Sequence, residues 1–142
     1  MDKIITEDYV SYDTAKLLRE KGFDEPCRSA YLWNGEEEEL CTSFSNHIQF
    51  NSEDCEDGDI PRISAPTFQM AMKWLRKVHH KYCDIRYDID LYWFFHIIEL
   101  KELKEHFDYS ELKYYHTENE IGFNSYEEAC EASIKYTLEN LI

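Results

Sequence analysis

Glycine and proline are scarce in this chain of 142 residues, which contains four glycines and three prolines. Phosphate-binding loops need closely spaced glycines, because only a backbone without side chains can approach a phosphate so closely. Linkers between domains are typically rich in glycine, serine or proline, and no such stretch occurs. The sequence therefore predicts a single domain over residues 1–142 and argues against a nucleotide-binding loop.

Positive charge is also scarce. The chain has 15 Lys and Arg against 30 Asp and Glu, a formal net charge of −15 at pH 7. Nucleic acids and anionic membranes are bound through clustered cations, so we expect no direct nucleic-acid partner and no membrane partner. A charge of this sign favours basic partners instead.

Long apolar runs are missing as well. The longest candidate, residues 91–98, is far shorter than the roughly 20 residues that a membrane-spanning helix requires. The first eight residues lack the apolar core of a signal peptide, and the five cysteines form an odd set. We therefore expect reduced thiols and a cytoplasmic location.

Three segments carry the sequence signals that mark helix ends. In the first, Ser11 is a candidate N-cap and Gly22 supplies a left-handed stop. The second is expected to begin near residues 65–67, with Pro66 in its first turn and Ala71, Trp74, Leu75 and Val78 as its apolar stripe. The third begins at a capping box in which Ser125 and Glu128 are expected to bond each other's backbone amides.

Strand patterns lie between the second and third helices. Apolar and polar residues alternate over residues 83–89, and an aromatic, β-branched run follows at 91–98; the two are expected to pair as a hairpin. Residues 111–116 predict a third strand, with a helix over 100–107 as an alternative. The expected fold class is α+β, with three helices packed on a small, mainly antiparallel sheet.

The segment from about residue 26 to residue 62 is expected to be an irregular acidic insertion. It has no Lys or Arg between Ser29 and Pro61, and short alternating pieces at 30–33 and 44–50 suggest edge strands around an exposed acidic turn. Its carboxylates form the candidate protein-interaction site. They are Glu36, Glu37, Glu38, Glu39, Glu53, Asp54, Glu56, Asp57 and Asp59.

Three blocks of sequence carry a family resemblance. They are TEDYVSYDTAKLLREKGFDE at 6–25, APTFQMAMKWLRKVHH at 65–80 and NSYEEACEASIKYTLENLI at 124–142. Together they resemble a family of small uncharacterised proteins of gut Bacteroides-type bacteria and their phages or prophages. The resemblance implies a phage-associated intracellular origin, and it supplies no catalytic residues because the family has no assigned reaction.

Metal sites and cofactors are not predicted. The loop at 53–60 resembles a calcium-binding EF-hand, but Cys55 and Ser64 would stand where hard oxygen ligands belong. A structural zinc site usually needs two close ligand pairs, and neither group of candidates contains two: Cys27, Cys41, His47 and Cys55, or His79, His80 and Cys83. Cys83 and Cys130 are expected to be buried structural thiols.

The sequence favours a small protein-interaction module, accessory or regulatory, that docks on a basic host or phage protein through its acidic surface. No catalytic residue is assigned, because no nucleophile motif is present. An enzyme with a scattered site built from His96, His116 and carboxylates is one alternative, and a DNA mimic that inhibits a nucleic-acid-binding protein is another. A homo-oligomer formed through an aromatic patch of Trp33, Phe44 and Phe50 is a third.

Overall fold

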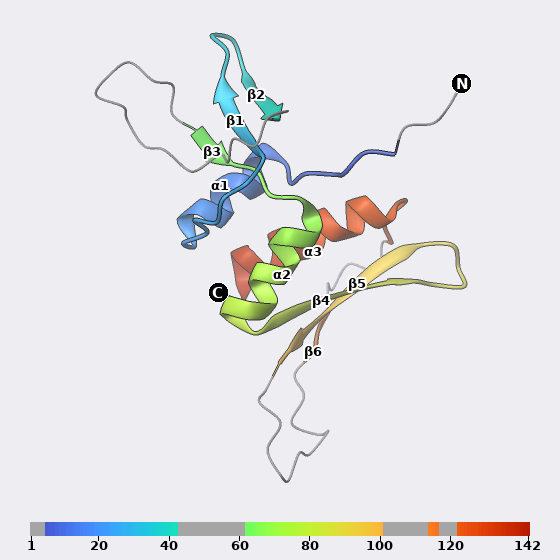
Figure 1. The fold of residues 1–142 in the computed structure, drawn as a ribbon. Helices are drawn as coiled ribbons and strands as arrows, with labels where there is room; N and C mark the ends of the chain where they lie inside the picture. Colours follow the sequence, from blue (N-terminus) through green and yellow to red (C-terminus); the bar gives the residue numbers. More distant parts are fainter. Residues whose placement is uncertain (1–4, 43–61, 101–113, 117–121) are drawn as a thin grey trace. The chain divides into compact units, whose positions relative to one another are not determined.

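The computed structural model describes residues 5–42, 62–100, 114–116 and 122–142, and for 114–116 it describes the backbone. The chain divides into two compact units, Met1–Gln69 and Met70–Ile142, and each is described by itself (Figure 1). The expected single domain over residues 1–142 stays a prediction.

The architecture is α+β, as the sequence predicts. The described residues form two three-stranded sheets, with strand orders β2-β1-β3 and β4-β5-β6, and every neighbouring pair is antiparallel. The predicted helices and antiparallel pairing are therefore confirmed, with the strands shared between two sheets. The elements are α1 (Tyr12–Glu20), β1 (Ser29–Trp33), β2 (Glu38–Thr42), β3 (Arg62–Ser64), α2 (Phe68–His79), β4 (Lys81–Tyr87), β5 (Trp93–Glu99), β6 (Tyr114–His116) and α3 (Tyr126–Asn140).

Helix α1 has the two ends that its sequence predicts. The Ser11 hydroxyl accepts a hydrogen bond from the amide of Thr14 at 3.3 Å, which satisfies a donor of the first turn. At the other end Gly22 takes φ +95°, and the amide of Phe23 donates to the carbonyl of Leu18 at 2.9 Å. Leu18 and Phe23 are both buried, so the chain reversal also fixes part of the core of this unit.

The first sheet occupies the segment that was expected to be irregular. Strand β1 lies between β2 and β3, and this order can be followed in Figure 1. Beyond β3, the Val10 amide donates to the carbonyl of Pro66 at 3.0 Å, and Tyr9 bridges to Thr67. These bonds tie the segment before α1 to the segment after β3.

Helix α2 departs from expectation at both ends. It begins at Phe68, so Pro66 does not occupy the first turn but lies in the extended segment before it, where its carbonyl bonds Val10. Within the predicted stripe Ala71, Trp74 and Leu75 are buried, whereas Val78 is 52% exposed. The apolar face therefore ends one turn earlier than the spacing predicts.

The predicted hairpin of the second unit is confirmed as β4 and β5, and β6 supplies the third strand. Phe95 and Ile97 are buried on one face of β5, while Phe94, His96 and Ile98 on the other face are half-buried. The second face is thus only partly covered. The strand is nevertheless central, as its aromatic composition indicates.

Helix α3 packs on β4 and β5. Its N-cap is Ser125, whose hydroxyl accepts from the amide of Glu128 at 3.1 Å, while the Glu128 carboxylate accepts from Asn124 and not from Ser125 as predicted. One face of the helix is buried, with Leu141 half-buried at its end. The buried members are Ala129, Cys130, Ser133, Ile134, Thr137 and Leu138.

Among the residues at 5–42, 62–100, 114–116 and 122–142, no helix has the length and apolar character needed to cross a membrane.

The turn between β4 and β5 holds a strained residue. Leu91 has φ +69°, a left-handed conformation that side chains with a Cβ rarely adopt. The Leu91 amide donates to the carbonyl of Asp88 at 3.0 Å, and the Asp88 amide donates to that of Tyr92 at 2.8 Å. Hairpins of this type usually place glycine at the left-handed position. The Leu91 side chain is 73% exposed, so burial does not offset the strain.

Replacing Leu91 with glycine should therefore stabilise the protein. We expect Leu91→Gly to raise the free energy of unfolding by about 0.5–1 kcal/mol, measured by urea denaturation. Ile89→Gly is the matched control, because Ile89 is 92% exposed in the same turn but has no positive φ. The control should show no gain, and a loss of stability in Leu91→Gly would contradict the strain.

Candidate functional site

The described part of the candidate site is a hairpin made of β1, the turn at 34–37 and β2, here called the acidic hairpin. Gly35 takes φ +102° in the turn, a conformation that L residues rarely adopt. The Asn34 side-chain oxygen accepts from the amides of Glu36 and Glu37, both at 2.9 Å, and the Asn34 amide donates to the carbonyl of Glu37 at 3.0 Å. One asparagine thus fixes the turn that carries Glu36 and Glu37.

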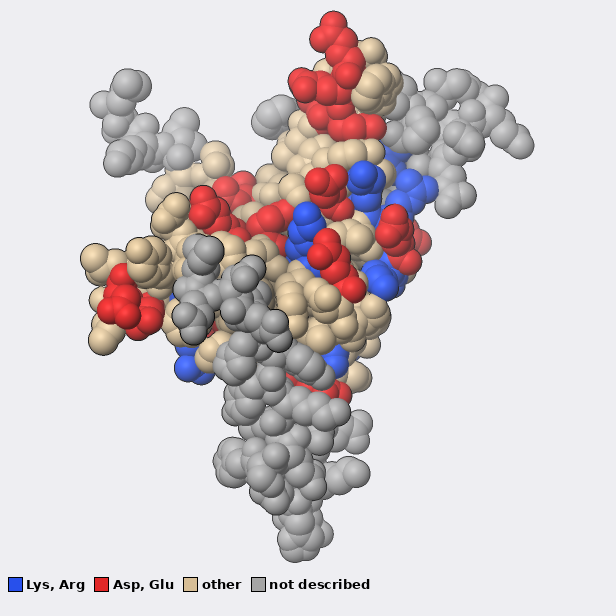
Figure 2. All heavy atoms as spheres, turned by 180° about the vertical axis from the view of Figure 1, so that it is seen from behind, with Lys and Arg blue, Asp and Glu red and all other residues tan. Residues whose placement is uncertain are grey.

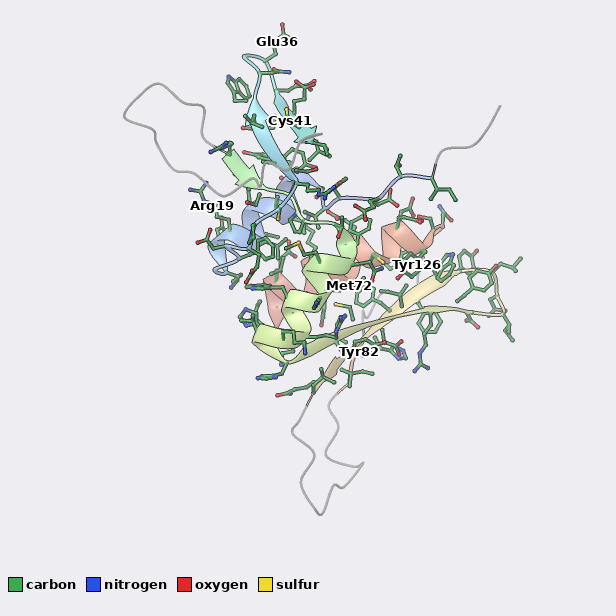
Figure 3. The ribbon with its side chains drawn as sticks, in the orientation of Figure 1. Arg19, Glu36, Cys41, Met72, Tyr82 and Tyr126 are labelled. Atoms are coloured by element: carbon green, nitrogen blue, oxygen red, sulfur yellow. The ribbon has the colours of Figure 1, made fainter. Side chains whose placement is uncertain are left out.

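The carboxylates of this hairpin face water. Glu36, Glu37 and Glu39 are exposed and Glu38 is half-exposed. Within the described residues none of the four takes part in an ion pair. Figure 2 shows acidic side chains gathered at the tip of the hairpin, and Figure 3 shows Glu36 directed away from the strands. Four negative charges are therefore concentrated in consecutive residues, two on the turn and two at the start of β2.

The base of the acidic hairpin is anchored by polar contacts. The hydroxyls of Ser29 and Thr42 lie 2.8 Å apart across the two strands. The Tyr31 hydroxyl donates to the carbonyl of Val10 at 2.7 Å, and the Tyr31 ring packs edge-on against that of Tyr12, with centroids 5.6 Å apart. These contacts hold β1 against the rest of its unit while the turn projects.

Two apolar side chains accompany the charges. Trp33 is 49% exposed and Leu40 is 37% exposed. In the strand register Trp33 stands opposite Glu38, and Leu40 stands opposite Tyr31, so both lie on the same face of the hairpin. Trp is enriched in protein contact surfaces, where a polar rim surrounds an apolar centre.

The remaining predicted site residues are Glu53, Asp54, Glu56, Asp57 and Asp59, and they lie outside the described residues, as do Phe44 and Phe50. Their role in binding stays a prediction. The strand β2 was missed, because the whole run of glutamates was assigned to a turn. The dipeptide Asn34-Gly35 is a strong hairpin signal that could have located it.

The histidines considered for catalysis lie in the second sheet. His96 is half-buried on β5, and the register places it opposite Asp84 of β4 and His116 of β6. The Asp84 carboxylate accepts a hydrogen bond from Nε of Arg86 at 2.7 Å, and the His96 ring contacts that of Phe94, with centroids 5.3 Å apart. The register thus places histidines and a carboxylate on neighbouring strands, as a scattered catalytic site would require. The Asp84 carboxylate, however, is already hydrogen-bonded to Arg86.

The cysteines divide by exposure. Cys27, Cys83 and Cys130 are buried, as expected for the last two, and Cys41 is exposed on β2 (Figure 3). Burial raises the pKa of the Cys27 thiol to about 11, and the negative charge of Glu25 adds to the rise. Burial likewise raises the pKa of Cys83, whose sulfur lies 3.9 Å from the Thr137 hydroxyl. Buried thiols of this kind are protonated at neutral pH and serve packing.

Within the described part of the chain, no group of three or more His, Cys, Asp or Glu side chains is arranged to hold a metal ion. Cys27 and Cys41 of the candidate zinc set lie in this part, and His47 and Cys55 do not.

An open hollow lies beside α1 in the first unit. It has a volume of about 440 Å³ and is lined by Lys16, Arg19, Glu20 and Ile63. Lys16 lies 3.6 Å from the Asp13 carboxylate and over the Tyr12 ring, so its charge is already engaged. The hollow therefore makes a weaker candidate for a binding site than the acidic hairpin.

Comparison of the chain with protein-family models, curated proteins and solved structures finds no match.

Thiol reactivity should follow burial. In the native protein at pH 8, iodoacetamide should modify Cys41 well before Cys27 or Cys83, because about one Cys27 thiol in a thousand is ionised when its pKa is 11. Mass spectrometry of the cysteine-containing peptides after short exposures measures the order. Guanidinium should abolish the difference, and native Cys27 or Cys83 reacting as fast as Cys41 would contradict their burial.

Proposed function

We propose that the protein is a small, phage- or prophage-associated interaction module that works in the cytoplasm as an accessory or regulatory factor. It binds a basic host or phage protein through the acidic hairpin. The observation that supports this most is the set of four glutamates at 36–39, which are water-facing and have no ion-pair partner within the described residues. The phage association rests on the three sequence blocks described above.

The geometry favours a protein partner over imitation of DNA. A DNA mimic requires rows of carboxylates spaced like the phosphates of a duplex. The four described glutamates instead follow one another from the turn into the start of β2, and exposed Trp33 and Leu40 lie beside them. Apolar side chains next to charges suit a protein surface, where burial of Trp and Leu strengthens the contact and charge attraction guides the encounter.

Neutralising the hairpin should weaken capture of a basic partner. We expect the variant Glu36→Gln, Glu37→Gln, Glu38→Gln and Glu39→Gln to bind roughly tenfold more weakly or worse, because several charge pairs are lost together. The measurement is affinity capture from host lysate, with each captured protein quantified by mass spectrometry. Raising the salt from 0.1 M, where the screening length is about 10 Å, should weaken capture in the same way.

The matched control removes the same charge elsewhere. Glu7→Gln, Asp24→Asn, Asp90→Asn and Glu139→Gln change exposed carboxylates outside the acidic hairpin, and they alter the net charge equally. The control variant should retain the partner. Equal loss in both variants would show that total charge, and not the acidic hairpin, governs binding.

A further inference from the structure

We propose that β2 receives an extended, basic segment of the partner as an additional strand of the first sheet. This inference rests on the proposed function and specifies how the partner is bound. Strand β2 is the outer strand of the sheet order β2-β1-β3, and all of its residues except Glu38 are exposed. An outer strand presents a row of backbone donors and acceptors that an added strand can bond.

The bonds of the turn show which backbone groups point outward. In an antiparallel pair, opposite residues alternate between pairs that bond each other and pairs whose amides and carbonyls point away. The bond from the Asn34 amide to the Glu37 carbonyl makes the closing pair a bonded one. The amides and carbonyls of Glu38, Leu40 and Thr42 must then point away from β1.

A bond on the opposite side of β1 supports the same assignment. The carbonyl of Ser29 accepts from the amide of Ala65 at 2.9 Å, so it points toward the β3 side and not toward β2. Ser29 stands opposite Thr42 in the register, which makes this a pair whose backbone groups point apart. Two independent bonds therefore place the backbone groups of the same β2 residues at the outer edge.

The side chains of β2 define the chemistry of the incoming strand. Leu40 and Glu38 lie on the face that carries Trp33, whereas Glu39 and Cys41 lie on the other face. An added strand should therefore place an apolar residue opposite Leu40 and a Lys or Arg opposite Glu38 and Glu39. Further cations should extend toward the turn, where Glu36 and Glu37 are exposed.

The other outer strands are less suited to a basic segment. Strands β3 (Arg62–Ser64) and β6 (Tyr114–His116) have three residues each and contain no Asp or Glu. Strand β4 carries Lys81, Asp84 and Arg86, and its Asp84 is already paired with Arg86. Charges of mixed sign on an edge oppose strand addition, so within the described sheets β2 is the edge that matches a basic partner.

A synthetic peptide tests the inference. The probe is acetyl-Thr-Val-Val-Lys-Lys-Lys-amide, ordered so that antiparallel pairing sets its residues against Thr42 first and Glu38 next to last. Its affinity is measured by isothermal titration calorimetry. Backbone contacts at β2 are followed in ¹H–¹⁵N spectra. We expect the largest shifts at the amides of Glu38, Leu40 and Thr42, because these would bond the peptide.

The variant Leu40→Pro removes one outward-pointing amide without removing a bond between β1 and β2. It should bind the peptide roughly tenfold more weakly or worse, whereas the control Leu40→Val, which keeps the amide, should bind within about twofold of the native protein. A peptide N-methylated on the residues that bond β2 tests the same contact in the unaltered protein. It should bind as weakly as the unmodified peptide binds Leu40→Pro.

The outcomes separate the mode of binding from the proposed function. If Leu40→Pro and the N-methylated peptide both bind normally while the four-glutamine variant binds weakly, strand addition is wrong and acidic docking stands. If the four-glutamine variant binds the peptide as tightly as the native protein does, the proposed docking of a basic partner through the acidic hairpin is wrong. Absence of binding by the unmodified peptide at millimolar concentration would also overturn the inference.

Discussion

The backbone pairing of β1 is the constraint on which the site depends. With β2 on one side and β3 on the other, β1 leaves β2 at the edge of its sheet. The Asn34 side chain and Gly35 then close the turn, so the register of the hairpin is fixed at its tip as well as at its base. Because side chains alternate with a period of two, this register decides which glutamate lies on which face.

Charge and backbone act together on this hairpin. Glutamates at an edge oppose pairing with another acidic or neutral strand, so they protect the protein from self-association through β2. The same charges favour a basic strand, which removes the repulsion among neighbouring carboxylates as it binds. In the proposed mode of binding, one row of residues both opposes self-association and selects a basic strand. In the second unit, the sheet packs against α3, whose Tyr136 ring contacts that of Phe95.

Helix ends that depend on local signals could be predicted from the sequence. Features that depend on contacts between distant residues could not. Ser11 and Ser125 cap helices because the capping bond joins residues only three apart. Pro66 fails as a helix start because its carbonyl bonds Val10, more than fifty positions away in the sequence. Val78 continues the apolar spacing of α2 but is exposed, since burial depends on what packs against each turn. Of the candidate site, the acidic charge was predictable from composition, whereas the edge position of β2 required the strand order.

Amide hydrogen exchange in β2, followed residue by residue by NMR, tests the central claim most directly. If the outer edge of this strand is unpaired, the amides of Glu38, Leu40 and Thr42 should exchange quickly, while those of Glu39 and Cys41, bonded to β1, should be protected. The account predicts this alternation in the free protein. Protection of Leu40 equal to that of Glu39 and Cys41 would show that the edge is already covered, and the proposed mode of recognition would then be wrong.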